Sequence, residues 1–202
     1  MRDKFYGDNR DLVKWGTLIE VAHRYDCKHI LQVLYFRPSQ WAQIEIDGKQ
    51  VEIAEEIFKH FRDSSSIRSL EFENLRIDVF SEEFVNRPRY LDATCLAIRS
   101  RKFVPGVVFL DPDTGLEPES GNYDSKHVRE VEVREIWKFL RPGDVLVLYQ
   151  HQDNRSGKEW IERKRTQFAQ ALEIIDPLAK RVKLAYAPDI AQDVAFYFVR
   201  KD

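Results

Sequence analysis

The chain has 202 residues, of which 43% are hydrophobic and 33% charged, and its formal net charge is −2 at pH 7. This length and composition predict a single globular domain over residues 1–202 with a sizeable apolar core. A net charge this close to zero excludes attraction of nucleic acid by the whole-molecule field, although a local basic face remains compatible with it.

The cysteines and apolar runs indicate the compartment. Cys27 and Cys95 belong to no Cys-x-x-Cys pair, which argues against a disulfide scaffold or a cysteine-rich zinc site. No apolar run reaches the roughly 20 residues that a membrane span needs. The charged residues 1–4 lead into no apolar signal segment. These features predict a cytoplasmic protein without a membrane partner, and they leave its oligomeric state open.

The first 80 residues contain several predicted elements. Helical spacing of apolar residues predicts a helix over 10–25, and a continuous apolar run predicts a buried strand over 30–36. The dipeptide Asp47-Gly48 predicts the turn of a small hairpin. A helix over 51–62 and one or two short strands within 67–80 are expected to follow.

From residue 90 onward, helices and strands alternate. The predicted elements are, in chain order, a helix over 90–102, a strand over 107–110, a helix over 126–140, a strand over 145–149, a helix over 158–172, and strands over 182–186 and 194–199. This alternation favours parallel pairing, whereas the last two strands have no helix between them and predict an antiparallel pair. The expected fold is therefore α/β, with a Rossmann-like, mostly parallel sheet and a C-terminal antiparallel strand pair.

Polar side chains follow two strands of this expected sheet. The strand over 107–110 runs directly into Asp111, and the strand over 145–149 runs into Gln150 and His151. Because the carboxyl ends of parallel strands meet at one edge, we expect Asp111 and His151 to line one site.

The N-terminal segment supplies further candidates. Asp8, Asp11 and Lys14 lie along one face if a helix begins near Asp8. We expect Asp8 or Lys14 to come within about one side-chain length of Asp111, with adjacent strands about 4.8 Å apart, and to close a single pocket with His151.

A basic stretch near the C-terminal third has two interpretations. It comprises Arg155, Lys158, Arg163, Lys164 and Arg165. It is either a solvated helix face or a surface that contacts the phosphates of DNA or RNA.

These motifs resemble those of class I S-adenosylmethionine-dependent methyltransferases. Val-Val-Phe-Leu-Asp-Pro at 107–112 resembles the acidic Asp-Pro-Pro-aromatic motif of the amino-group enzymes, and Leu-Arg-Pro-Gly-Asp at 140–144 resembles the turn before their fifth strand. The opening Tyr-Gly-Asp-Asn-Arg-Asp-Leu-Val-Lys-Trp at 6–15 looks like that of the large-subunit ribosomal RNA adenine methyltransferases, with Asp8 and Trp15 in place of an Asn and a His.

The same segments resemble an uncharacterised bacterial family. Its members open Phe-Gly-Asp-x-x-Asp-x-x-Lys-Tyr-Gly and carry Asp-Pro-Asp-Asn-Gly-Leu-Glu and Tyr-Gln-His. The matching segments here are residues 6–16, 110–117 and 149–151. This second resemblance implies no particular activity.

The methyltransferase resemblance implies a methyltransferase-type fold and an enzyme that uses S-adenosylmethionine on nucleic acid. The catalytic candidates are then Asp111, Asp113 and His151, and the cofactor-binding candidates are Asp8, Asp11 and Lys14. Fold-level likeness by itself does not establish function.

The chain departs from the methyltransferase pattern at three places. The strand over 30–36 runs into Arg37 and Pro38, not into the Gly-rich turn that lets backbone approach a cofactor. Asp113 and Thr114 stand where the family has its second Pro and its aromatic residue. The candidates for the acidic residue that binds the ribose of the cofactor are Glu71, Glu73 and Asp78.

Two alternatives follow from these departures. Asp111, Asp113 and Glu117 supply oxygen ligands suited to Mg²⁺ or Mn²⁺, which suggests a divalent-metal-dependent nuclease or phosphodiester hydrolase. The missing Gly-rich turn favours instead a non-catalytic binding protein on a decayed methyltransferase scaffold.

Overall fold

The computed structural model describes residues 9–37, 43–46, 49–52, 74–102, 105–121, 124–152, 159–174 and 181–202. The helices of this part are α1 (Asn9–Arg24), α3 (Arg87–Ser100), α4 (Glu130–Phe139) and α5 (Trp160–Ala171). The strands are β1 (His29–Val33), β2 (Gln43–Ile46), β3 (Lys49–Glu52), β4 (Arg76–Phe80), β5 (Val107–Leu110), β6 (Gly115–Leu116), β7 (His127–Val128), β8 (Val145–His151), β9 (Lys183–Ala187) and β10 (Ala191–Arg200).

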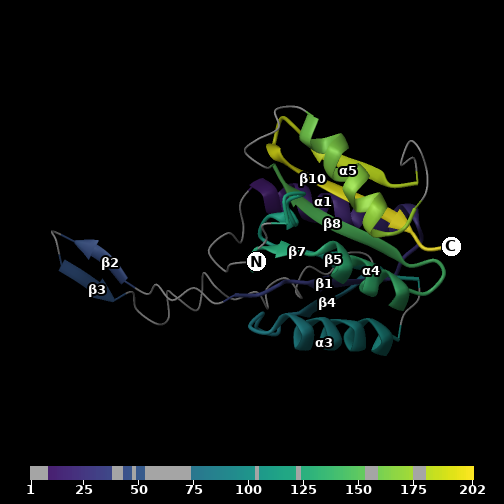
Figure 1. The fold of residues 1–202 in the computed structure, drawn as a ribbon, viewed down its shortest axis with the longest axis horizontal. Coiled ribbons are helices and arrows are strands. Elements are labelled where there is room, and N and C mark those ends of the chain that lie inside the picture. The colour runs from purple at the N-terminus through teal and green to yellow at the C-terminus, as the bar shows by residue number, and fades with distance from the viewer. Residues whose placement is uncertain are drawn as a thin grey trace.

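Six of these strands form one twisted sheet in the order β4-β1-β5-β8-β10-β9 (Figure 1). The strands β4, β1, β5 and β8 are parallel, whereas β10 runs antiparallel to both β8 and β9. The expected Rossmann-like sheet, mostly parallel with a C-terminal antiparallel pair, is confirmed. The strands that end near Asp111 and His151 are neighbours, as the sequence predicted.

The sheet is covered on both faces, which explains why its central strands are mostly apolar. Every residue of β1 and β5 is buried. Leu31 and Val33 pack on the face covered by α3, α4 and α5, whereas Ile30 and Leu34 pack on the face covered by α1 (Figure 1). The period-two alternation of a strand thus divides the core into two clusters.

Two strands near the N-terminal half behave differently from the central sheet. The strands β2 and β3 pair only with each other, in a register that joins Ile44 to Val51. The predicted hairpin is confirmed, whereas the predicted helix over 51–62 is wrong at its start, since β3 extends to Glu52. The rest of that helix lies outside the described residues.

Other element boundaries shift for local reasons. The strand predicted over 30–36 ends at Val33, because Tyr35 takes a left-handed φ of 48°. The helix predicted over 126–140 begins only at Glu130, after the short strand β7. Among the described residues, no helix combines the length and the apolar character that crossing a membrane requires.

Candidate functional site

The topology of the sheet locates the candidate site. From β1 the chain moves outward to β4 and then returns to β5 on the other side of β1. Open α/β sheets bind ligands at such a switch point, in the crevice outside the carboxyl ends of the strands. Here that position lies between the end of β1 and the end of β5, where Asp111 follows Leu110.

Asp111 is the centre of a buried polar network on the α1 face. Lys14 Nζ donates to Asp111 Oδ2 at 3.1 Å and to Asp11 Oδ1 at 2.7 Å. Gln32 Nε2 in β1 donates to the same Asp111 oxygen at 2.7 Å. All four side chains are buried. The predicted approach of Lys14 to Asp111 is therefore confirmed, whereas Asp8 lies outside the described residues.

The charge of Lys14 is maintained by its neighbours. Burial alone lowers the pKa of Lys14, but the carboxylates of Asp111 and Asp11 outweigh burial and leave that pKa above its ordinary value. The ammonium also lies 5.6 Å from the ring centroid of Tyr149. A buried carboxylate with a bonded cation is tolerated, whereas one left alone is costly. Lys14 thus makes the buried position of Asp111 possible.

The loop after Asp111 is held by Gln150, which sequence reasoning did not single out. Gln150 Oε1 accepts from Leu116 N at 2.9 Å, and Gln150 Nε2 donates to Thr114 O at 3.0 Å. Gly115 adopts a φ of 109°, and a Cβ there would lie 2.3 Å from Gln150 Oε1. The two motifs of the sequence, around Asp111 and around His151, therefore form one interlocked unit.

Glu117 supports the start of a helix in this structure. Its Oε1 accepts from the backbone N of Glu130, the first residue of α4, at 2.9 Å. Its backbone carbonyl accepts from Lys164 Nζ and Gln167 Nε2, both at 2.9 Å. A carboxylate at a helix N-terminus satisfies a backbone donor and interacts favourably with the helix dipole.

Asp113 lies in the same loop, two residues after Asp111. Its carboxylate pairs with the guanidinium of Arg37, which follows the end of β1. The second Arg37 nitrogen, Nη1, donates to Ser125 Oγ at 2.7 Å. Asp113 and Arg37 therefore link the segments that follow β5 and β1 across the switch point.

The three carboxylates proposed as metal ligands have separate partners. Asp111 bonds Lys14, Asp113 pairs with Arg37, and Glu117 caps α4. Within the described part of the chain, no three His, Cys, Asp or Glu side chains form a group that could hold a metal ion. The geometry does not favour the metal-dependent interpretation.

His151 belongs to a second cluster near the same edge. Its Nε2 lies 3.0 Å from Asp193 Oδ2, and Asp193 also pairs with Arg10 of α1 at 2.5 Å. The hydrogen bond from Arg10 holds the pKa of Asp193 below its ordinary value. A hollow of about 520 Å³ adjoins Arg10 and Asp193. Lys14 thus bonds Asp111, whereas His151 lies against Asp193 in a separate cluster.

The turn after β1 lacks the glycine of the methyltransferase pattern but still has a residue with a positive φ. Tyr35 has a φ of 48°, in the left-handed region that glycine enters most readily. Its buried ring packs against Phe84 and Tyr90, with centroids 5.4 and 5.2 Å away. The Tyr35 backbone N–H donates to Tyr90 Oη at 2.9 Å. An aromatic cluster therefore holds the turn in a conformation that the sequence did not predict.

Acidic residues follow the end of β4, beside this turn. Glu82 and Glu83 are exposed, and Phe84 N donates to Phe36 O at 2.7 Å, which joins this segment to the end of β1. In dinucleotide-binding folds an acidic side chain at the next strand contacts the ribose. The sequence feature that could have identified Glu82 and Glu83 is the acidic Ser-Glu-Glu segment directly after a strand of alternating pattern.

The earlier ribose candidates do not occupy that place. Asp78 lies within β4 and bonds His29 and Arg76, which are the first residues of β1 and β4. The expectation for Asp78 is therefore wrong, because its strand position directs it away from the carboxyl edge. Glu71 and Glu73 lie outside the described residues.

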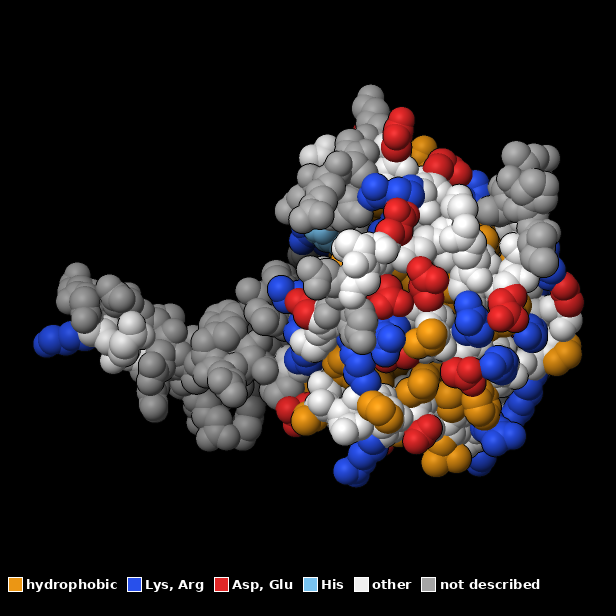
Figure 2. Space-filling view, in the orientation of Figure 1, with side chains coloured by type: hydrophobic (Ala, Val, Ile, Leu, Met, Phe, Trp, Pro, Cys, Tyr) orange, Lys and Arg blue, Asp and Glu red, His pale blue; other side chains and the backbone are white. Residues whose placement is uncertain are grey.

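The basic side chains of α5 contact other residues of the same chain. Lys164 is buried, with its amine on Glu117 O. Arg165 Nε donates to Val182 O at 2.8 Å, and Arg163 Nε lies 3.7 Å from a Glu119 oxygen. On the face drawn in Figure 2, acidic and basic side chains are interspersed over the body. Both proposed interpretations of the stretch are wrong for Lys164. Arg155 and Lys158 lie outside the described residues.

Comparisons with known proteins give likenesses of fold at low identity. No family model and no curated protein matches this chain. A solved structure of a proposed methyltransferase from Thermobifida fusca YX is 14% identical over 96% of this chain and 80% of that chain, with a TM-score of 0.45. Human methyltransferase-like protein 13, in complex with SAH, is 12% identical over 95% and 80%, with a TM-score of 0.41.

A third solved structure, an O-methyltransferase from Bacillus cereus in complex with SAH, is 15% identical over 92% of this chain and 79% of that chain, with a TM-score of 0.39. Because these TM-scores are below 0.5, the likenesses carry no argument about activity. The strand order of the chain itself carries the fold assignment.

Proposed function

We propose that this chain is an S-adenosylmethionine-dependent methyltransferase that acts on an amino group of nucleic acid. The observation that supports the proposal is the sheet order β4-β1-β5-β8-β10-β9, with β10 antiparallel and an Asp-Pro pair at the switch point. The strand order of the sheet determines where a ligand binds, and the polar residues at that position determine which class of ligand binds there.

The carboxyl edge has features suited to a nucleoside cofactor. The exposed carboxylates of Glu82 and Glu83 follow β4 and suit the hydroxyl groups of a ribose. The left-handed backbone at Tyr35 provides a tight turn after β1, and the Tyr35 ring is buried in the core. When bound, S-adenosylmethionine supplies an electrophilic methyl group.

Asp111 contributes by position in this proposal. Lys14 and Gln32 fix its carboxylate beneath the loop that carries Pro112 and Asp113. The same loop carries the ion pair between Asp113 and Arg37. Pre-organised dipoles of this kind orient an amine without reorganisation at the moment of reaction.

Cofactor binding is the first test. Isothermal titration with S-adenosylmethionine compares the wild-type chain with a Glu82→Gln/Glu83→Gln variant and with a Glu20→Gln control. Glu20 is exposed on α1 and pairs with Arg24. We expect the double variant to bind at least about tenfold more weakly, since one charged hydrogen bond contributes about 1.5–3 kcal/mol, and the control to be unchanged. Folded wild-type protein without measurable binding would contradict the proposal.

The substrate class is the second test. Protein, tritiated S-adenosylmethionine and separate pools of RNA, DNA and protein are incubated, and the labelled pool is identified. We expect label in nucleic acid, and much less label with Asp111→Asn. Label confined to the protein pool would contradict the nucleic-acid substrate while retaining the methyltransferase.

The second candidate function is a non-catalytic binding protein on this scaffold. The observation that favours it is that Asp111 is only 2% exposed and already bonded by Lys14 and Gln32. It predicts that S-adenosylmethionine is not bound, or is bound without methyl transfer to any pool. The two titration and labelling experiments therefore separate it from the enzyme.

A further inference from the structure

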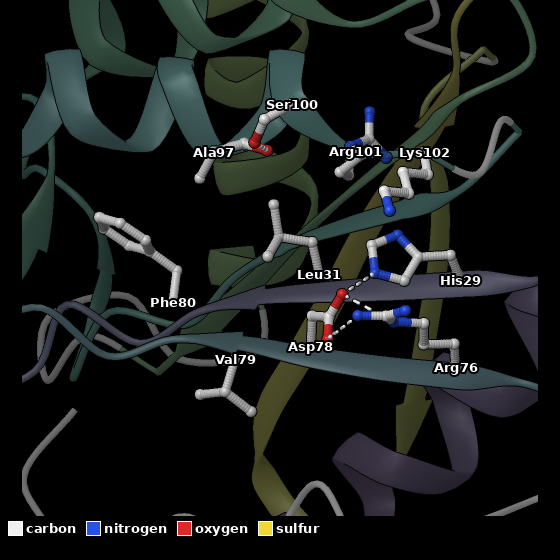
Figure 3. A pocket seen from close by; sticks show the side chains of 10 residues that line it. All are labelled: His29, Leu31, Arg76, Asp78, Val79, Phe80, Ala97, Ser100, Arg101 and Lys102. Carbon is white, nitrogen blue, oxygen red and sulfur yellow. Dashed lines mark hydrogen bonds and ion pairs between the residues drawn. The ribbon is translucent and has the colours of Figure 1, made fainter.

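A second cavity lies away from the switch point, between the sheet and the C-terminal end of α3. Its volume is about 300 Å³, and its walls include His29, Leu31, Arg76, Asp78, Arg101 and Lys102 (Figure 3). His29 and Arg76 are the first residues of β1 and β4 and lie opposite each other in the sheet. The charged part of the cavity is therefore at the amino edge, whereas Asp111 is at the carboxyl edge.

Positive charge exceeds negative charge in this lining. Arg76, Arg101 and Lys102 line the cavity together with the carboxylate of Asp78, and Arg101 also pairs with Asp144 behind the wall. That carboxylate accepts from Arg76 Nε and lies 3.0 Å from His29 Nε2. Burial lowers the pKa of His29 despite its bond to Asp78, so the imidazole is neutral at pH 7. With Asp144 included, the described residues of this wall therefore carry three positive and two negative charges.

Arg101 forms the fixed part of the charged wall. Its Nη2 donates to Asp144 Oδ2 at 2.5 Å, and its Nε donates to Ile98 O at 3.1 Å. Its side chain is 2% exposed, and its Nη1 is buried with no hydrogen-bond partner among the described residues. A buried donor without a partner is costly, and an anion beside it removes that cost.

Lys102 forms the movable part of the same wall. It is exposed, and Figure 3 shows its side chain extending across the cavity toward His29. A flexible ammonium beside a fixed guanidinium suits a phosphate, which accepts from both kinds of donor.

The other end of the cavity is apolar. Leu31, Phe80 and Ala97 line it, and in Figure 3 Phe80 lies at the end remote from Arg101 and Lys102. Ligand sites of this size are mostly apolar, with a few polar groups that fix orientation. The fitting ligand thus has an anionic head and a flat, apolar body.

We propose that this cavity binds a phosphomonoester of nucleotide size, with the phosphate at Lys102 and Arg101 and the base toward Phe80. The same chemistry is offered by a free nucleoside monophosphate and by the 5′-phosphate end of a nucleic-acid strand. The inference does not depend on the methyltransferase proposal, because it concerns the opposite edge of the sheet.

The first experiment uses AMP, adenosine and inorganic phosphate as probes in isothermal titration. Wild-type protein is compared with Lys102→Gln and with Lys138→Gln, whose lysine is exposed on α4 and paired with Glu135. We expect AMP to bind more tightly than adenosine or phosphate, and Lys102→Gln to weaken AMP about tenfold without affecting adenosine. Lys138→Gln is expected to match wild type.

Two results would overturn the proposal. One is equal binding of AMP and adenosine, since the charged wall would then have no role. The other is equal AMP affinity in wild type and Lys102→Gln. Titration of S-adenosylmethionine into Lys102→Gln is expected to match wild type, so a failure here is distinguishable from a failure at the switch point.

A second experiment identifies the source of the phosphate. A ten-nucleotide strand with a 5′-phosphate is compared with the same strand carrying a 5′-hydroxyl. Tighter binding of the phosphorylated strand than of AMP indicates a strand end, whereas binding of AMP alone indicates a free nucleotide. Both results support a phosphomonoester site, and equal binding of both strands with no AMP binding contradicts it.

Discussion

At the scale of single residues, buried charges set the constraints on this molecule. Lys14 is 4% exposed and bonds two carboxylates from different elements, Asp11 on α1 and Asp111 after β5. Such a cation does more than add one ion pair, because its removal leaves two buried carboxylates with less compensation. His29 differs from Lys14 because burial lowers the pKa of His29 and favours its neutral form.

The first prediction concerns Lys14. We expect Lys14→Met to lower the free energy of unfolding by about 3–5 kcal/mol, because Asp11 and Asp111 lose their buried cation. Urea unfolding followed by circular dichroism measures this change. The matched control is Lys138→Met on the exposed face of α4, with an expected change within about 0.5 kcal/mol. A loss below about 1 kcal/mol for Lys14→Met would show that the network does not depend on its charge.

The second prediction concerns pH. The pKa of His29 is lowered by burial in the folded state, whereas in the unfolded chain it is about 6.5. Below about pH 6.5 the unfolded chain therefore binds more protons at His29 than the folded chain does. The stability that comes from burying neutral His29 is complete above about pH 6.5 and is lost as the pH falls through the folded pKa of His29. We expect His29→Gln to lose less stability than wild type between pH 7.5 and 5.

Urea unfolding at several pH values in that window checks the His29 prediction. The pKa of His127 is also lowered by burial, but this residue is present in both proteins and its effect cancels. Parallel stability curves for wild type and His29→Gln would refute the assignment.

At the scale of elements, the loop from Asp111 to Glu117 is held by contacts with β8, α4 and α5. Gln150 of β8 bonds the backbone of Thr114 and Leu116, and Glu117 caps α4. Lys164 of α5 donates to the Glu117 carbonyl from the far side. The conformation of the loop is therefore set by its neighbours, which keeps its polar residues at the crevice in one arrangement.

The third prediction tests this interlock. Gly115→Ala places a Cβ 2.3 Å from Gln150 Oε1 at a φ of 109°, and we expect a loss of at least about 2 kcal/mol in unfolding free energy. Gly16→Ala is the matched control, since a Cβ there meets no atom within 4 Å and Gly16 lies inside α1. That control is expected to stabilise by up to about 1 kcal/mol. Equal effects of the two substitutions would contradict the interlock.

At the scale of the whole molecule, the antiparallel strand completes the sheet. The strand β10 lies between β8 and β9, and its residues from Val194 to Val199 are buried. Its side chains belong to both core clusters, Ala195 and Tyr197 to one and Phe196 and Phe198 to the other. Both faces of the core therefore depend on the C-terminal segment.

The fourth prediction follows from this dependence. A chain that ends at Ile190 lacks β10, and we expect it not to fold, because β8 and β9 lose their shared partner. Circular dichroism and amide hydrogen exchange measure the outcome. A chain that lacks only the exposed Asp202 is the control and is expected to fold as wild type. Protected amides in the shorter chain would contradict the prediction.

Much of the fold was accessible from the sequence because strand burial leaves a direct pattern. The apolar runs before Asp111 and His151 identified neighbouring parallel strands, and the lack of a helix before the last strand identified the antiparallel pair. The helical spacing of Asp11 and Lys14 placed both on one face, and the approach of Lys14 to Asp111 followed from the position of Asp111 at the strand end. Whether these residues act in binding or catalysis stays a prediction, as does the single domain.

The sequence by itself determined most helices and strands, two neighbouring parallel strands and the edge at which their polar residues gather, since periodicity reports which side of an element is buried. Only the tertiary structure decided that Glu117 caps α4, that Asp78 faces Arg76, and that Tyr35 takes a left-handed turn. The physical reason is that these roles depend on register and packing between distant segments. A pattern along one segment contains no information about which side chain of another segment lies opposite it.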